Sequence, residues 1–67
     1  MTTDQAIAAV IWRGLRVNNL FQIGDHWRAN VTDETKFWEF AGGATPVEAI
    51  LAALAKVPVA PVEDIFA

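Results

Sequence analysis

The segment GGATPVEAI, residues 42–50, constrains the fold more than any other part of this chain. Thr45 is a favourable helix N-cap, Pro46 suits the first helical position, and Glu48 completes a capping box. The two glycines before them permit backbone conformations that other residues resist, which favours a sharp reversal. The pattern therefore predicts a strand, a glycine turn and a helix that ends shortly before Pro58.

The two sides of this helix differ in size. One side carries large apolar residues, and we expect it to face the core: Val47, Ile50, Leu51 and Leu54. The other side is nearly all alanine. Either another element approaches that side closely, or it is an exposed surface with high helix propensity.

An earlier helix is predicted from about residue 3 to residue 18. Thr2 and Gln5 have the spacing of a capping box at its start. Trp12 falls outside its apolar stripe and lies one helical turn from Arg16, so we expect Trp12 to be exposed. The residues at helical spacing that form the stripe are Ile7, Val10, Ile11, Gly14, Leu15 and Asn18.

A β-hairpin is predicted between the two helices. Residues 26–31 alternate in polarity, and residues 36–41 return after a polar connection at 32–35. Gly24 and Asp25 indicate a bulge or a short turn before the first strand. The face expected to point inward consists of Trp27, Ala29, Val31, Trp38 and Phe40, which leaves Phe37, His26, Arg28 and Asn30 outside. A two-stranded sheet is weak alone, so a third strand is expected from Leu20 to Ile23, from the tail or from a second subunit.

These elements define an α+β fold of the helix–β-hairpin–helix type, with two helices packed on one face of a small antiparallel sheet. We assign residues 1–57 to one domain and residues 58–67 to an extended, proline-containing C-terminal tail. Ile65 and Phe66 follow two acidic residues in that tail and are candidates for a second partner-binding anchor. They loosely resemble the acidic, hydrophobic-ended tails of bacterial single-stranded DNA-binding proteins. The alternative is that the tail packs back onto the domain or its symmetry mate.

The composition excludes several ways of stabilising so short a chain. There is no cysteine and one histidine, so disulfides, thiolate zinc sites and histidine-built metal sites are not expected, and neither is a cofactor. Because 54% of the residues are hydrophobic and three are tryptophan, we expect aromatic packing or a homo-oligomer. The net charge of −3, an N-terminus unlike a signal peptide and short apolar runs predict a cytoplasmic protein without membrane contact.

Catalytic chemistry has few residues to use. Serine, cysteine and tyrosine are absent. Asp25 and His26 are neighbours, and neighbours on a strand point to opposite faces, so we do not expect them to form an acid–base pair. The sequence therefore predicts a protein that is not an enzyme.

A binding function accounts for the aromatic residues predicted to be exposed better than catalysis does. Trp12 and Phe37 are placed off the core, with Arg16 and Arg28 as companions, and such residues dominate interface energies. A protein partner is the leading interpretation. Nucleic-acid binding, with Arg13 added to the surface, is the alternative, although the net charge disfavours it. A structural homo-oligomer is the third interpretation.

The stretch WEFAGGATPVEAILAAL, residues 38–54, resembles the strand–Gly–Thr-Pro-x-Glu-Ala–helix segment of small phage-encoded αβα-sandwich domains. It is more distantly similar to HicB-like antitoxin domains, which open with a strand instead of a helix. The matching residues are Trp38, Gly43, Thr45, Pro46, Glu48, Ala49, Ile50 and Leu54. The resemblance implies an accessory protein of a phage or mobile element that binds and inhibits a bacterial host protein, as anti-CRISPR proteins do.

Overall fold

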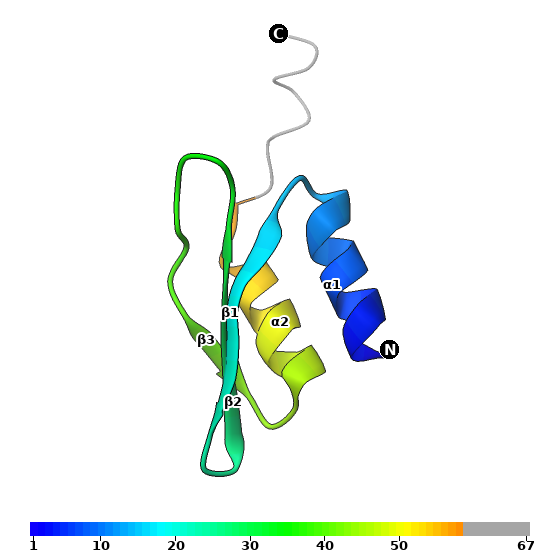
Figure 1. Ribbon diagram of the computed structural model, residues 1–67, viewed down its shortest axis with the longest axis vertical. Helices are drawn as coiled ribbons and strands as arrows, with labels where there is room; N and C mark the ends of the chain where they lie inside the picture. The colour runs from blue at the N-terminus through cyan, green and yellow to red at the C-terminus, as the bar shows by residue number, and fades with distance from the viewer. Residues whose placement is uncertain (59–67) are drawn as a thin grey trace, which may run out of the picture.

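The computed structural model describes residues 1–58 of the chain. Two helices cover one face of a three-stranded antiparallel sheet with strand order β1-β2-β3, and the opposite face is open (Figure 1). This confirms the predicted α+β class. Neither helix in these residues has the length and hydropathy of a membrane span. The elements in chain order are α1 (Thr3–Trp12), β1 (Arg16–Ile23), β2 (His26–Thr32), β3 (Ala41–Gly43) and α2 (Pro46–Ala55).

Helix α1 begins as predicted, with the reciprocal capping box of Thr2 and Gln5, but it ends six residues early. Gly14 has a φ of +78° and donates its N–H to the Ile11 carbonyl, while Leu15 donates to the Val10 carbonyl. These two bonds form a Schellman motif, and the burial of both Val10 and Leu15 completes it. The prediction of a helix to residue 18 was wrong because Gly14 is the stop signal and not a member of the apolar stripe.

The chain then enters β1 and returns through β2. Ile23 pairs with His26, so Gly24 and Asp25 form a two-residue turn, as the sequence indicated. Gly24 has a φ of +59° and Asp25 has no positive φ, which are the signs of a type II′ turn. The third strand expected near Leu20 is therefore β1, and it is longer than predicted.

The partner of β2 on its other side differs from the prediction. Residues 36–40 form a connection and not a strand, although Thr32 and Phe37 make one isolated bridge. The glycines expected to form the turn lie in β3, where Gly42 pairs with Arg28 and Gly43 pairs with Trp27. Gly43 is required for a steric reason, because a Cβ added there would lie 2.6 Å from the Glu48 Cβ and 2.7 Å from the Ala49 amide nitrogen.

Helix α2 starts where the sequence predicts, with Thr45 as N-cap, although the Glu48 carboxylate bonds to the residue before the N-cap and so does not close the predicted capping box. The Thr45 hydroxyl accepts the Glu48 N–H at 3.1 Å, and the Glu48 carboxylate accepts the Ala44 N–H at 2.9 Å. Of the large apolar side, Ile50 is buried and Val47 and Leu54 pack against the core, while Leu51 is exposed. The alanine side also approaches the sheet closely, the first of the two alternatives, with Ala49 and Ala53 fully buried. Small side chains allow this close approach. The buried core consists of Ala6, Val10, Leu15, Ala29, Val31, Ala41, Ala49, Ile50, Ala53 and Val57.

The two helix ends are joined by Arg13, the residue after α1. Its guanidinium donates to the carbonyl oxygens of Leu54 at 3.4 Å, Val57 at 3.3 Å and Pro58 at 3.5 Å. Leu54 belongs to the last turn of α2, and Val57 and Pro58 follow that helix, so Arg13 connects the end of α1 to the end of α2 and the residues just after it. Arg13 is exposed, as the sequence predicted, but its guanidinium is engaged by carbonyl oxygens at the helix ends and does not join Arg16 and Arg28 on one basic surface.

Candidate protein-binding face

Strand pairing determines which side chains lie on the face that the helices leave open. Ala29 and Val31 of β2 are fully buried and face the helices, so the alternate residues of β2 face the other way. Paired residues in a sheet share a face. The open face therefore carries Arg28 with its partners Phe21 and Gly42, and His26 with its partner Ile23.

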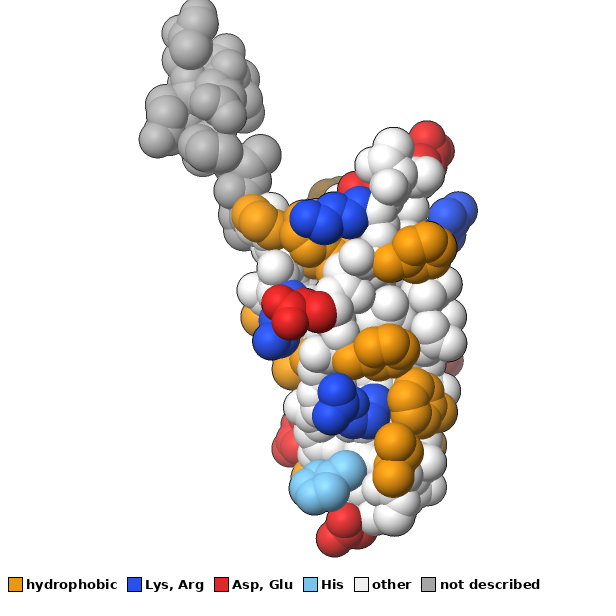
Figure 2. Space-filling view, turned by 90° about the vertical axis from the view of Figure 1, so that its left-hand side faces the viewer, with side chains coloured by type: hydrophobic (Ala, Val, Ile, Leu, Met, Phe, Trp, Pro, Cys, Tyr) orange, Lys and Arg blue, Asp and Glu red, His pale blue; other side chains and the backbone are white. Residues whose placement is uncertain are grey.

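Large apolar side chains gather on this open face. Phe37 is 70% exposed, Ile23 60%, and Phe21 and Phe40 39% each. The rings of Phe21 and Phe40 meet edge to face, with centroids 5.7 Å apart. Figure 2 views the molecule from this side and shows hydrophobic side chains along the face beside Lys, Arg and His groups. We call Phe21, Ile23, Phe37 and Phe40 the open-face patch.

A buried asparagine, Asn30, links two segments that carry residues of this patch. β1 has a bulge between Val17 and Asn19, so Asn18 and Asn19 both lie opposite Asn30. The Asn30 side-chain oxygen accepts both carboxamide N–H groups, at 3.4 and 3.1 Å, and its own N–H group donates to the Trp38 carbonyl at 3.1 Å. The prediction that Asn30 is exposed was wrong, because the connection of residues 36–40 runs alongside β2 at this point and covers the Asn30 side chain. The network joins β1 to that connection and positions the segment carrying Phe37.

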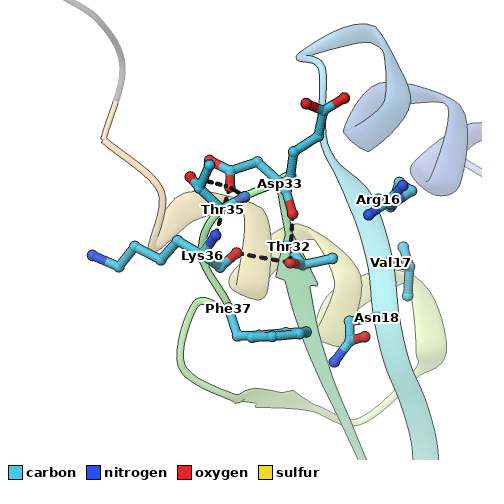
Figure 3. A pocket seen from close by; sticks show the side chains of 9 residues that line it. Arg16, Val17, Asn18, Thr32, Asp33, Thr35, Lys36 and Phe37 are labelled. Carbon is cyan, nitrogen blue, oxygen red and sulfur yellow. Dashed lines mark hydrogen bonds between the residues drawn. The ribbon is translucent and has the colours of Figure 1, made fainter.

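A hollow of about 330 Å³ lies at one end of the open face, between β1 and the connection after β2 (Figure 3). Arg16 and Phe37, two of the predicted site residues, line it from opposite sides. The Phe37 ring extends across the end of β2 toward Asn18. Arg16 is the first residue of β1, so the expectation that it follows Trp12 on a helix was wrong.

The wall of this hollow is a tight turn built around one carboxylate. Oδ1 of Asp33 accepts the backbone N–H groups of Thr35 and Lys36, both at 2.7 Å, and the Thr35 hydroxyl at 3.0 Å. These bonds, the backbone ones first, stabilise the charged form and lower the pKa of Asp33, with a small contribution from the Lys36 ammonium. The turn therefore favours the ionised form of Asp33.

The same hollow offers no activated nucleophile. The Thr32 hydroxyl lies 2.7 Å from the Lys36 carbonyl and 2.8 Å from the Asp33 carbonyl, so its proton is directed to backbone oxygen. No base lies within hydrogen-bond reach of it among residues 1–58. Within the same range, no group of three or more His, Cys, Asp or Glu side chains could hold a metal ion.

A second hollow of about 340 Å³ lies toward the hairpin turn and is lined by Ile23, His26, Arg28 and Gly42. The expectation that Asp25 and His26 point apart was wrong, because Asp25 lies in the turn and its Oδ1 is 3.6 Å from His26 Nε2. Both side chains are largely exposed, so this contact contributes little. Arg28 lies on the open face as predicted, beside Gly42.

The predicted site residues thus divide between two surfaces. The structure brings Arg16, Arg28 and Phe37 to one face. Trp12 is 90% exposed, as expected, but it belongs to α1 and lies in the helix layer. The last two candidates, Ile65 and Phe66, lie outside the described residues.

Sequence reasoning identified one of the four residues of the open-face patch, Phe37, and missed the other three. Phe40 was expected in the core and instead contacts Phe21 on the open face. Phe21 and Ile23 were not proposed as site residues, because β1 was assigned partly to a helix. The Gly24-Asp25 turn was a usable signal, since the alternation it starts extends backward along β1 as well as forward along β2.

Comparisons with protein-family models, with curated proteins and with solved structures gave no match to this chain.

Proposed function

We propose that this chain is a non-catalytic binding domain whose open face recognises a protein partner. The observation that carries the proposal is the open-face patch: four large apolar side chains exposed on a sheet surface that no other described segment covers. Clustered exposed aromatic groups beside arginine are typical of interface centres. Arg16 and Arg28 flank the patch, so the matching surface is apolar with acidic groups at its margin.

The proposed partner class is a bacterial host protein that is bound stoichiometrically and inhibited. This part rests on the resemblance of residues 38–54 to phage-encoded domains. The hollow beside Phe37 is compatible with this mode of action, because the proton of the Thr32 hydroxyl there is directed to backbone oxygen.

Nucleic acid is the competing ligand, since arginine beside phenylalanine can also hold a single strand. The available charge argues against it. Arg13 is engaged by carbonyls of the α2 end, and the Lys36 ammonium lies 4.1 Å from the Trp38 ring centroid. Within residues 1–58 this leaves Arg16 and Arg28 beside the patch, and two arginines on a chain of net charge −3 give a small electrostatic footprint.

Site-specific photo-crosslinking tests the proposal, with benzoylphenylalanine placed at Phe37 and, as the matched control, at Trp12. Both positions are exposed aromatics, but only Phe37 lies on the open face. In bacterial lysate, Phe37 should capture one discrete protein that Trp12 does not. Phe37→Ala should then weaken binding of the purified partner at least about tenfold, as expected for an interface anchor.

Two outcomes would overturn the proposal. One is equal capture at both positions. The other is fluorescence anisotropy that shows salt-dependent binding of an oligothymidine strand, lost in Arg28→Ala, while no protein is captured.

A further inference from the structure

The outer edge of β1 is an eight-residue strand edge without a partner among residues 1–58. β1 pairs with β2 on one side only, since the strand order is β1-β2-β3. No described residue outside β2 forms a hydrogen bond with the backbone of β1. Its inward-facing residues Val17 and Leu20 are only half-buried, although they face the core. The strand is therefore incompletely covered on its free side.

This edge lacks the usual protection against strand pairing. Natural edges carry lysine, proline or an inward charge, or are very short. From Val17 to Ile23 there is neither a charged residue nor a proline. The one protective feature along this edge is the bulge at Asn18, near the start of β1, and the strand pairing of residues 19–23 is regular. Such an edge is suited to accept a further strand.

The hairpin turn determines which backbone groups this edge presents. Ile23 and His26 flank a two-residue turn and form a hydrogen-bonded pair, as the ends of a tight turn do. Antiparallel pairs alternate, so Phe21 also bonds to β2. The N–H and C=O groups of Leu20 and Gln22 between them point to the free edge.

We propose that two copies of this chain pair along β1 in antiparallel orientation, with Phe21 on the two-fold axis. In this register Leu20 of each copy lies opposite Gln22 of the other, so the outward-pointing groups satisfy one another. The two sheets join into one, with all helices on one face. The two Phe21 rings lie side by side on the open face, as a non-hydrogen-bonded pair.

Charge favours the same arrangement. Arg16 begins β1 and Asp25 lies just beyond its other end, and both are exposed. Antiparallel pairing around Phe21 brings Arg16 of each copy next to Asp25 of the other. Opposite charges therefore meet at both ends of the seam, which selects a second copy over an unrelated strand.

This dimer does not depend on the proposed function, because the two copies are joined by backbone hydrogen bonds along the free edge of β1. The pairing also brings Phe21 of the open-face patch to the two-fold axis, while Phe37 lies outside the seam. It would extend that function, since pairing joins two open-face patches into one continuous surface. The experiments below measure only self-association. A negative result there would overturn the dimer and leave the partner-capture test at Phe37 unaffected.

Cysteine cross-linking tests the register, and the chain has no native cysteine to interfere. Phe21→Cys places two thiols across the axis on Cα atoms about 4.5 Å apart, within disulfide range. Ile23→Cys is the matched control on the same face, with its two Cα atoms about 14 Å apart. In a glutathione redox buffer, Phe21→Cys should form covalent dimer and Ile23→Cys should not.

Sedimentation velocity on the unmodified chain gives a second, independent measurement. It should show a concentration-dependent dimer. Arg16→Glu should weaken the dimer at least about threefold, and adding Asp25→Arg should restore it. A monomer at all concentrations, a dimer unaffected by the charge exchange, or equal cross-linking of the two cysteine variants would overturn the proposal.

Discussion

The close approach of α2 to β3 makes a sharp prediction for two adjacent glycines. Gly43 faces the helices, and a Cβ there would lie 2.6 Å from the Glu48 Cβ and 2.7 Å from the Ala49 amide nitrogen. These atoms are backbone, or the Cβ attached directly to it, in the first turn of α2, so they cannot move aside as the end of a flexible side chain would, and α2 must shift from the sheet in Gly43→Ala. Gly42 faces the open side, where the nearest atoms to an added Cβ are the Trp27 carbonyl oxygen at 3.4 Å and the Arg28 Cδ at 3.7 Å.

The expected cost follows from this difference. Overpacking a core contact costs about 1–3 kcal/mol, and contact with backbone atoms puts Gly43→Ala at the upper end of this range, about 3 kcal/mol. A domain of this length has a total stability of about 3–10 kcal/mol. Gly42→Ala meets ordinary contacts at a φ that alanine accepts, so its change should stay within about 0.5 kcal/mol.

Thermal unfolding followed by circular dichroism measures both variants at one protein concentration. For a domain of this size, each kcal/mol lowers Tm by about 4–8 °C, so Gly43→Ala should melt roughly 12–24 °C below Gly42→Ala. Equal melting temperatures would refute the reasoning that β3 and α2 approach closely at this point.

Two further predictions concern the helix end and the loop. Gly14→Ala should cost about 1–2 kcal/mol by urea denaturation, because alanine is strained at a φ of +78°; an unchanged midpoint would contradict the Schellman stop. The stability difference between the native chain and Asp33→Asn should be full above about pH 4 and should shrink as pH falls through the folded pKa, since that pKa is lowered. Denaturation curves from pH 7 to pH 2 measure it, and a difference that grows on acidification would refute the assigned cause.

The fold class followed from local signals that tertiary structure does not override. Both helix starts are specified by side chains that bond to nearby amides, at Thr2 and at Thr45. The turn at Gly24 and Asp25 is equally local. These signals give the α+β class and the antiparallel arrangement before any packing is known.

The errors arose where two local interpretations were equally good. Helical spacing continued through Gly14, and only the left-handed φ there shows that the helix stops. Residues 36–41 alternate in polarity as a strand does, but the Asn30 network and the Asp33 turn hold residues 36–40 as a connection. Because β1 was misassigned, the strand that contributes half of the open-face patch was not recognised from the sequence.

Arg13 gives the molecule a property that its short helices would otherwise lack. One guanidinium contacts three carbonyl oxygens 41 to 45 residues away in the chain, so one side chain connects the end of α1 to the end of α2. Helix ends normally fray independently, and their amide protons exchange quickly with solvent. Because Leu54 belongs to the last turn of α2 and Val57 and Pro58 follow it, we expect fraying there to loosen the contact with α1, so that the two ends open together.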